Sequence, residues 1–472
     1  MNTSKKRRFF FPVLIAVIVT GILLLAACAS LSALEAVQPE EPGRRTEAEE
    51  RYLSSVLDTL YPERTSPELS ALPYPAAPAQ LAVNAGSAIL VDVQTGSILY
   101  EKNADESIPP ASMTKLVEMY VVFKAVEDGE VSLDDEVPLP PESWAENLPS
   151  DASRMYLGKG QHVTLRELLL GLAIASGNDA SIAVARYVCG SMEDFVARMN
   201  STVSSMGLTR THFVESSGYS EENRTTAREF AAFSRIYLKK YPQSLSLFHA
   251  QAQLRYPQAK NLPAQQRHLG DSLAITQRNT NKLLGKIPGC DGLKTGYIDE
   301  SGYNIALTAE QNGTRFLSIT MRGPGHSTAE GNLYRVADGL TLFNYAFSHF
   351  ADYHAPQQGE HEFTVGLTGA QGKAIKLVPA LDETFTVPFI AGDSPTGAAA
   401  SVHVRADVPD CLYGGIRCGQ QYGTLTYYLE DSILRTVPLV ADRDVPAAGL
   451  PGRLWGKLLY RLALFFVQLV KQ

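Results

Sequence analysis

The sequence predicts an α+β protein in which one antiparallel sheet packs with helices, followed by a small all-β domain and a C-terminal amphipathic helix. In residues 81–355, strand patterns come first, helical patterns fill the middle, and strand patterns with a final helix end the segment. In residues 356–446, short alternating runs separated by Gly, Pro and Asp indicate strands alone. The chain has 472 residues, 45% of them hydrophobic, which is sufficient for two globular domains with additional terminal segments.

The N-terminus has the features of an export signal. Basic residues 5–8 precede the uninterrupted apolar run of residues 9–27, which is also nearly long enough to cross a bilayer. The run ends in Leu-Ala-Ala-Cys28, which resembles a bacterial lipobox, and Cys28 is then the lipidated first residue of the mature chain. An uncleaved anchor is the alternative. In both cases residues 1–30 are expected to place the rest of the chain outside the cytoplasm, attached to the membrane on the periplasmic or outer face.

Residues 31–80 are polar and interrupted by prolines, which predicts a spacer with one short helix at 48–60. The next segment is expected to begin with a hairpin at 88–100, where Gln94-Thr95-Gly96 supplies the turn. Helical periodicity and capping patterns then predict helices at residues 113–126, 168–175, 180–188 and 226–240. Strands are expected at 293–298, 302–309 and 314–322, before a last helix at 333–350.

The all-β domain and the C-terminus differ clearly in pattern. Short strands are expected at residues 363–367, 374–378, 384–389, 400–406, 423–429 and 433–439. In residues 447–472, apolar side chains such as Leu454 and Trp455 recur at helical spacing, basic residues occupy the other side, and no acidic residue follows Asp444. This pattern is typical of a helix bound to a membrane surface, although packing on protein is an alternative. We therefore expect residues 447–472 to associate with a membrane.

Charge and cysteine content exclude several function classes. The formal charge is −8 and no extended basic patch lies outside the termini, so nucleic acid is not an expected partner. The sequence has no Cys-x-x-Cys or His-Glu-x-x-His pattern, so neither a metal nor a cofactor is expected. Cys411 and Cys418 flank a turn-like segment and are predicted to form a disulfide in an oxidising compartment. Cys189 and Cys290 lie in apolar surroundings and are expected in the core.

Ser112-Met113-Thr114-Lys115 places a nucleophile beside a base. A serine hydroxyl reacts poorly near neutral pH unless a base lies within hydrogen-bond reach. If a helix begins near Ser112, Lys115 lies one turn later on the same face, and the helix N-terminus stabilises developing negative charge. Lysine can act as the base only when its pKa falls by several units, which burial and a second cation would both cause. Taken alone, the pattern is more typical of a capped helix with a solvated lysine.

Two further motifs follow in order, Ser176-Gly177-Asn178 and Lys294-Thr295-Gly296. With the first motif they resemble the active-site motifs of the penicillin-recognising serine acyl-enzymes, which include β-lactamases and D-alanyl-D-alanine peptidases. Their flanks, Pro110-Ala111, Asp179-Ala180 and Asp291-Gly292-Leu293, are similar to those of the low-molecular-mass penicillin-binding proteins, the S11 serine-type D-Ala-D-Ala carboxypeptidases. The resemblance covers about residues 81–350 and implies a β-lactamase/transpeptidase-like fold. The β domain and C-terminal helix also fit this family's plan.

The resemblance implies a role for the residues of the first two motifs. Ser112 would be the nucleophile and Lys115 its base, with Lys294 as the nearby second cation. Ser176 would shuttle the proton between Lys115 and the leaving amine. Asn178 would donate from its side-chain amide to the backbone of the substrate.

The third motif would bind the substrate. Lys294 and the Thr295 hydroxyl would hold the terminal carboxylate of the substrate. Gly296 would let an extended substrate approach the strand closely and pair with it as an added strand. The oxyanion hole would consist of the backbone N–H groups of Ser112 and Tyr297.

The resemblance also implies one further binding residue, and the sequence departs from the family pattern at two places. An arginine past the third motif often helps to bind the carboxylate in this family, and Arg335 is the candidate. Ile298 stands where the family often has threonine, and residues 215–219, Glu-Ser-Ser-Gly-Tyr, replace a commoner Asn-x-x-Gly-Leu. Either departure could alter substrate choice or the rate of deacylation.

The resemblance implies removal of the terminal D-alanine from peptidoglycan stem pentapeptides through a Ser112 acyl-enzyme, in cell-wall biogenesis, with β-lactams acylating the same serine. A β-lactamase is one alternative, with Glu215 activating the deacylating water; the β domain and C-terminal helix argue against it. A non-catalytic wall-binding protein is another, which the complete set of polar motif residues disfavours. An α/β-hydrolase esterase would rest on residues 325–329, Gly-His-Ser-Thr-Ala, which lack the second glycine of a nucleophile elbow.

Overall fold

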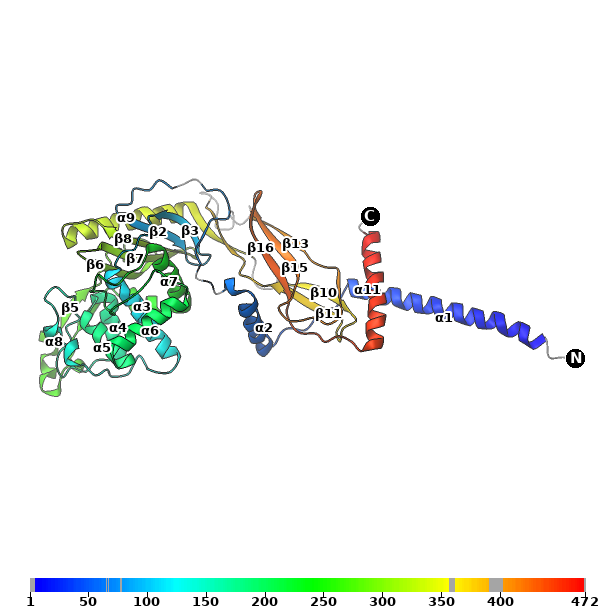
Figure 1. Cartoon of the computed structure of the whole chain (residues 1–472), viewed down its shortest axis with the longest axis horizontal. Coiled ribbons are helices and arrows are strands. Elements are labelled where there is room, and N and C mark those ends of the chain that lie inside the picture. The colour runs from blue at the N-terminus through cyan, green and yellow to red at the C-terminus, as the bar shows by residue number, and fades with distance from the viewer. Residues whose placement is uncertain are drawn as a thin grey trace. The chain divides into compact units, whose positions relative to one another are not determined.

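The structure is a computed structural model that describes residues 5–64, 66, 68–76, 79–355, 361–389 and 402–470 (Figure 1). The chain divides into two compact units. Residues 67–353 and 385–398 form one unit, which contains all three motifs and is called here the motif unit. Residues 1–66, 354–384 and 399–472 form the other, called here the β unit.

The motif unit is built on a six-stranded sheet with the order β1-β3-β2-β8-β7-β6. Its strands are β1 (Ser70–Ala71), β2 (Ser87–Asp92), β3 (Ser97–Lys102), β6 (Cys290–Ile298), β7 (Gly302–Gln311) and β8 (Thr314–Gly323). Neighbours pair antiparallel except β1, which runs parallel to β3. The third motif therefore lies on β6, which is an edge strand.

Helices cover both faces of this sheet, which is why every residue of β2 is buried (Figure 1). Successive strand side chains point to opposite faces. Ile89 and Val91 accordingly pack into one core with α3 and its neighbours, whereas Ala88 and Leu90 pack into a second core with α9. The helices of this unit are α3 (Lys115–Glu127), α4 (Leu165–Leu170), α5 (Asn178–Cys189), α6 (Met192–Ser205), α7 (Ala227–Lys240), α8 (Gly270–Leu273) and α9 (Thr328–His349).

The predicted elements of this unit are present, with differences in type and with several additional elements. The predicted helix at 168–175 is α-helical only to Leu170 and continues as a π-helical turn, Gly171–Ala175. The predicted helix at 113–126 begins with a 3₁₀ turn, Ala111–Thr114, before α3. The helices α6 and α8, the strand β1, and the two-stranded sheet of β4 (Gln253–Tyr256) and β5 (Ile275–Arg278) were not predicted. A short ribbon of β9 (Phe350–His354) and β12 (Thr384–Pro388) completes the strand pairing.

The β unit contains a second six-stranded sheet, with the order β13-β15-β16-β11-β10-β14. Its strands are β10 (Phe363–Thr368), β11 (Ala374–Pro379), β13 (Val402–Asp407), β14 (Cys411–Tyr413), β15 (Gln421–Leu429) and β16 (Ser432–Ala441). The predicted spacer helix is α2 (Glu47–Leu60), which begins with a capping box formed by Thr46 and Glu49. It is not a free spacer, because Leu53 and Leu57 are buried against Val378 and Val440 of the sheet.

Two terminal helices complete the β unit, α1 (Lys5–Val37) and α11 (Leu450–Val470). Within α1, Val17–Val37 is long and apolar enough to cross a membrane by length and composition. Ala29 and Ala33 near its C-terminal end are buried against Leu459 and Ala463 of α11. Figure 1 shows α11 crossing α1 at this point. Cys28, the lipidation candidate, is an exposed residue of α1.

The structure contradicts the predicted disulfide, since Cys411 and Cys418 are free thiols. Cys411 is buried in the cluster formed by α1 and α11. Cys418 is buried in a different cluster, beside Leu53 of α2 and Val440 of β16. The intervening turn therefore directs the two side chains into separate apolar clusters instead of toward each other.

Candidate active site

The first motif lies in a tight turn that leads into α3. Ser112 belongs to the 3₁₀ turn, and Ala111 before it has a left-handed φ of 50°. Gly218 packs against this turn so closely that a Cβ at 218 would lie 1.9 Å from the Ala111 carbonyl oxygen. A non-glycine residue in left-handed backbone is strained, so its surroundings must hold it in place. The packing of Gly218 supplies that restraint and fixes the position of Ser112.

Lys115 is fully buried, and its ammonium group has three acceptors. Lys115 Nζ donates to Ser112 Oγ at 3.1 Å, to Asn178 Oδ1 at 2.8 Å and to the Ser217 carbonyl at 2.6 Å. An ammonium has three N–H donors, so these contacts satisfy it completely. The structure thus brings the first two motifs together around one lysine.

The second motif follows the end of the π-helical turn. Ser176 has a left-handed φ of 58°, which ends that turn, and α5 begins two residues later at Asn178. The Asp179 carboxylate accepts from three backbone N–H groups of residues 155–157, at 2.8, 2.8 and 3.0 Å. The Asn178 N–H donates to the Ser153 carbonyl at 2.8 Å. The motif is therefore tied to a neighbouring loop through the start of α5.

The third motif approaches the other two from the sheet edge. Lys294 is fully buried, and its Nζ donates to Ser176 Oγ and to the Thr295 carbonyl, both at 2.9 Å. The Thr295 hydroxyl donates to Thr280 Oγ1 at 2.8 Å. Lys115 and Lys294 thus meet within one site, but each contacts a different serine hydroxyl.

Gly296 allows the close approach of β6 to the Ser112 turn. A Cβ at this position would lie 2.6 Å from the Pro110 carbonyl oxygen and 3.1 Å from the Ser112 nitrogen. Both atoms belong to backbone, so they could not move aside without shifting the turn. We expected this glycine to make room for substrate; in the structure it makes room for the turn that carries the serine.

The electrostatics of the two lysines differ from expectation. Burial lowers the pKa of Lys115 to about 8, while the carboxylates of Glu118, Glu215 and Asp179 oppose this shift. Burial lowers the pKa of Lys294 well below its ordinary value, and the charges of Lys115 and Arg335 lower it further. Burial therefore lowers the pKa of both lysines, and for Lys294 two neighbouring cations add to the effect. Burial, rather than the charge of Lys294, is the main cause of the lowered Lys115 pKa.

Arg335 and Tyr297 lie at the same end of the sheet. Arg335 is nearly buried on α9, donates to the Gly296 carbonyl and to Asn332 Oδ1, and lies 4.9 Å over the Tyr303 ring. Burial lowers its pKa to about 10. Its Nε has no partner among the described residues. Tyr297 is partly exposed, its ring lies 4.3 Å from the Tyr303 ring at an interplanar angle of 30°, and its hydroxyl group donates to Asp299.

Sequence reasoning missed two groups that hold this site. Glu118 is buried on α3, one turn after Lys115, and accepts from Ser181 Oγ at 2.8 Å. The second is the Ser217 carbonyl, which accepts from Lys115. Glu215, considered from the sequence only as a residue that activates water, accepts from the backbone N–H groups of Ser217 and Gly218, both at 2.7 Å. The only available signal was an unusual one, an acidic residue inside the otherwise apolar run of residues 116–123.

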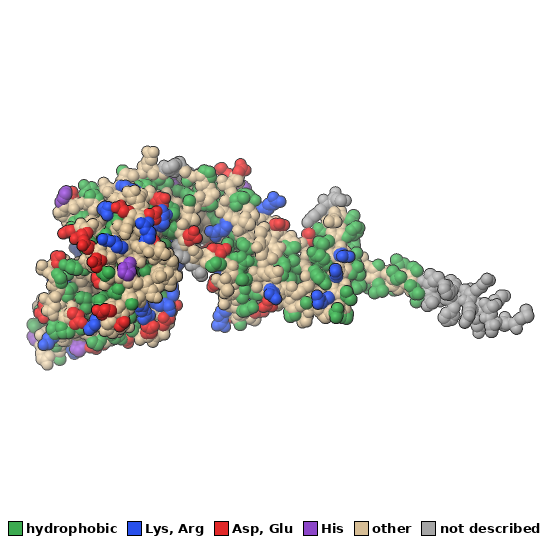
Figure 2. Space-filling model, viewed as in Figure 1, with side chains coloured by type: hydrophobic (Ala, Val, Ile, Leu, Met, Phe, Trp, Pro, Cys, Tyr) green, Lys and Arg blue, Asp and Glu red, His purple; other side chains and the backbone are tan. Residues whose placement is uncertain are grey.

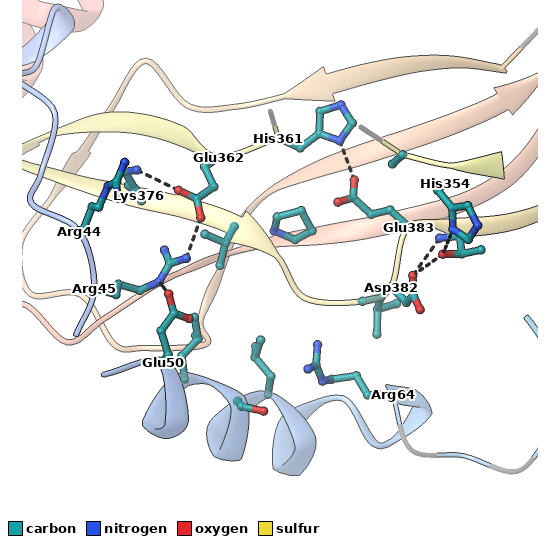
Figure 3. Close-up of a pocket in the computed structure, with 18 of the residues that line it drawn as sticks. Arg44, Arg45, Glu50, Arg64, His354, His361, Glu362, Lys376, Asp382 and Glu383 are labelled. Carbon is teal, nitrogen blue, oxygen red and sulfur yellow. Dashed lines mark hydrogen bonds and ion pairs between the residues drawn. The ribbon is translucent and has the colours of Figure 1, made fainter. Parts of the chain in front are cut away.

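A separate pocket of about 980 Å³ lies in the β unit and contains none of the motif residues (Figure 3). Glu362 at its centre accepts from Arg45 at 2.7 Å and from Lys376 at 2.9 Å, and Arg45 also bonds Glu50. These ion pairs link Arg45 and Glu50 of the α2 segment to Glu362 and Lys376 at the sheet. Among the described residues, no group of three or more His, Cys, Asp or Glu side chains could hold a metal ion.

Comparison with known proteins agrees with this geometry. The sequence profile of the D-alanyl-D-alanine carboxypeptidase family, peptidase S11, matches residues 74–325, and that of the penicillin-binding protein 5 C-terminal domain matches residues 353–447. D-alanyl-D-alanine carboxypeptidase DacF of Bacillus subtilis is 30% identical over 373 residues, which cover 78% of this chain and 88% of that protein. DacA of Escherichia coli K12 is 28% identical over 81% of this chain and 88% of its own length.

Solved structures show the same relationship. The crystal structure of penicillin binding protein 5 from Haemophilus influenzae matches with a TM-score of 0.66 and 26% identity, covering 79% of this chain and all of that chain. Penicillin binding protein 6B from Escherichia coli matches with a TM-score of 0.61 and 25% identity, over 79% of this chain. The chain therefore belongs to the S11 family of serine-type D-alanyl-D-alanine carboxypeptidases, the low-molecular-mass penicillin-binding proteins.

Proposed function

We propose that this D-Ala-D-Ala carboxypeptidase removes the terminal D-alanine of peptidoglycan stem pentapeptides through an acyl-enzyme on Ser112. The contact of Lys115 Nζ with Ser112 Oγ, at 3.1 Å in a site where the lysine is fully buried, carries this proposal. With a Lys115 pKa of about 8, roughly a tenth of the amine is neutral at pH 7. That fraction can accept the serine proton, which a solvated lysine could not do at this pH.

Acylation uses residues of all three motifs. The neutral Lys115 amine takes the proton of Ser112 Oγ while that oxygen bonds to the carbonyl carbon of the penultimate D-alanine. The backbone N–H groups of Ser112 and Tyr297 donate to the oxyanion. The C–N bond then breaks, and the leaving nitrogen receives the proton from Lys115 through Ser176. Lys294 donates to Ser176 Oγ, which leaves the hydroxyl proton of Ser176 available for this transfer.

Deacylation repeats these steps with water. Lys115 takes a proton from water as its oxygen bonds to the acyl carbon, and the bond from that carbon to Ser112 Oγ breaks. Ser112 recovers the proton from Lys115, so the enzyme returns to its starting state. Asn178 holds Lys115 through its side-chain oxygen, and its NH₂ group is the donor for the substrate backbone.

Cationic and hydroxyl groups near Gly296 suit the terminal carboxylate of the substrate. We assign Thr295, Lys294 and Arg335 to this carboxylate. Arg335 is held by the Gly296 carbonyl and the Tyr303 ring, so its guanidinium is ordered before substrate arrives. The free edge of β6 offers backbone groups to an extended peptide.

The position of Glu215 disfavours the β-lactamase alternative. Its Oε1 accepts from the Gly218 N–H at 2.7 Å, and its Oε2 accepts from Ser217 N–H at 2.7 Å and from Ser217 Oγ at 2.6 Å. Both oxygens are therefore used to fold the loop. A residue that activates water needs an oxygen directed toward the acylated serine. β-Lactams should accordingly acylate Ser112 and be released slowly.

We also propose that α11 attaches the enzyme to the outer face of a membrane. Its apolar side chains Leu450, Leu454 and Phe465 are 74%, 69% and 57% exposed. Figure 2 shows hydrophobic side chains gathered over this helix, with Lys and Arg among them. An exposed apolar stripe combined with positive charge suits an anionic lipid surface. The apolar helix α1 would add a second attachment, either as an anchor or through a lipid on Cys28.

The catalytic proposal is tested by the mass of the intact protein after brief exposure to penicillin. We expect one covalent adduct on the wild type and none on Ser112→Ala, with D-alanine release lost in the same variant. Ser204→Ala, at an exposed position on α6, is the control and should label fully. An equal adduct on Ser112→Ala would refute the assignment of the nucleophile. For the membrane, flotation with vesicles containing phosphatidylglycerol should weaken when residues 450–472 are removed, and loss of this segment should leave D-alanine release unchanged.

A further inference from the structure

A buried carboxyl group lies beside the catalytic lysine, outside the three motifs. Glu118 is on α3 one turn after Lys115, and none of its surface is exposed. Its Oε2 accepts from Ser181 Oγ at 2.8 Å, whereas its Oε1 is buried with no partner among the described residues. A buried carboxyl oxygen without a partner is costly to stability. The mechanism above gives Glu118 no role, so its presence needs an explanation.

Two hydroxyl groups connect Glu118 to the loop over Lys115. Ser181 Oγ lies 2.7 Å from Ser216 Oγ as well as 2.8 Å from Glu118. A hydroxyl has one proton, so if Ser181 donates to Glu118, then Ser216 must donate to Ser181. Both protons then point toward the carboxylate and favour its charged form. Ser216 directly precedes Ser217, whose carbonyl accepts from Lys115.

Glu215 holds the same loop from the opposite side. Its two oxygens bind the N–H groups of Ser217 and Gly218 and the amide nitrogen of Asn223. With both N–H groups directed toward Glu215, the Ser217 carbonyl is directed toward Lys115. The loop that covers Lys115 is therefore attached at two carboxylates, Glu118 through hydroxyl groups and Glu215 directly.

The charged groups around Lys115 come from five elements. Glu118 lies on α3, Glu215 on the loop and Asp179 on α5, and these three favour the ammonium form of Lys115. Lys294 on β6 and Arg335 on α9 are the cations of the site, and both lie nearer the third motif. Of the three acids, Glu118 has the largest effect on the pKa of Lys115. Burial raises the pKa of Glu118, whereas the charge of Lys115 and the hydrogen bond from Ser181 lower it, so Glu118 and Lys115 titrate as a pair.

We propose that Glu118 is a positioning residue for the general base: its charge sets the pH at which Lys115 gives up its proton, and its hydroxyl relay holds the loop carbonyl that orients Lys115. The inference rests on the proposed role of Lys115 as the base. In this arrangement Glu118 does not touch substrate. It stabilises the resting ammonium, so that the amine becomes available only when the pH approaches the titration of the Lys115–Glu118 pair.

The test is the pH dependence of penicillin acylation by the full chain. Glu118→Gln keeps the shape of the side chain and removes its charge. We expect the acidic limb of the pH–rate profile of acylation to move to lower pH by about one to two units. This is the effect of a unit charge one helical turn away at an effective dielectric constant of about 20. Glu127→Gln is the matched control, since Glu127 is an exposed acid on the same helix. Its limb should coincide with that of the wild type.

Two further variants separate the charge from the relay. Ser181→Ala removes the donor to Glu118 but keeps the carboxyl group, so the limb should move in the same direction by a smaller amount. Glu215→Gln should move the limb and also lower the plateau rate, because the loop carbonyl is released. If Glu118→Gln does not fold, Ser181→Ala carries the test alone.

The outcomes distinguish this inference from the proposed function. A folded Glu118→Gln that labels on Ser112 but keeps the wild-type limb overturns the role of Glu118 and leaves the acyl-enzyme mechanism standing. An unmoved limb in a folded Ser181→Ala likewise overturns the relay. Absence of an adduct on the wild type would instead overturn the proposed function. Measured melting temperatures establish in each case that the variant is folded.

Discussion

Replacing Gly296 with alanine tests whether the site depends on the close approach of β6 to the Ser112 turn. The added Cβ would lie 2.6 Å from the Pro110 carbonyl oxygen and 3.1 Å from the Ser112 nitrogen, whereas ordinary contact begins at 3.4 Å. Both neighbours are backbone atoms, so no side chain can rotate away. The strand and the turn must therefore separate by about 0.8 Å.

This displacement acts on the catalytic contacts directly. Lys294 and Thr295 lie on the strand that must move, and Lys294 Nζ is only 2.9 Å from Ser176 Oγ. Misplacement by about 1 Å typically costs about 100-fold in rate, which corresponds to about 2.7 kcal/mol in activation free energy. We expect the second-order rate of penicillin acylation and kcat/KM for D-alanine release both to fall by about this factor. Overpacking should also lower the free energy of unfolding by about 1–3 kcal/mol.

Rapid-mixing measurements with a fluorescent penicillin give the acylation rate, and thermal unfolding gives the stability. Gly158→Ala is the control, because its new methyl group would meet only the Gln161 side chain, at 3.4 Å. That variant should retain the wild-type rate. A Gly296→Ala enzyme that acylates within threefold of the wild-type rate would show that the strand and turn do not need this contact distance.

Three further predictions follow from the site. The acylation rate should fall about tenfold per pH unit below about pH 8, because the base must be neutral and the pKa of Lys115 is about 8; a flat profile down to pH 6 would contradict this. Arg335→Lys should raise KM for the peptide about 10-fold or more, since lysine cannot stack on Tyr303 and hold its charge in one plane, and steady-state kinetics measure the change. Asp179→Asn should destabilise the motif unit by about 2–3 kcal/mol, because three N–H groups of residues 155–157 lose a charged acceptor; denaturant titration would show an unchanged midpoint if this reasoning is wrong.

Local patterns predicted most elements of the chain for clear physical reasons. The hairpin predicted at residues 88–100 corresponds to β2 and β3 in the structure, and the helices predicted at 168–175 and 226–240 correspond to α4 with its π-helical turn and to α7. Such patterns act within a few residues, so the sequence displays them directly. The three motifs were recognisable for a related reason, because each needs particular side chains at fixed short spacing.

Other features depend on contacts between residues far apart in the chain. Nothing near Cys411 or Cys418 shows that one packs beside α1 and the other beside α2. The need for glycine at 296 arises from the Ser112 turn that packs against it, and this contact is not apparent from the local sequence. Helical spacing places Glu118 one turn after Lys115, but its full burial and its contact with Ser181 depend on distant parts of the chain.

The chain by itself specified the candidate nucleophile, its lysine neighbour, the order of strands and helices, and therefore the class of chemistry, since those depend on residue type and spacing. Only the tertiary structure decided how far the pKa values of the lysines fall, because desolvation arises when distant segments close over a side chain and remove its water. The charge of an amine follows from what surrounds it in space, which no short stretch of sequence contains.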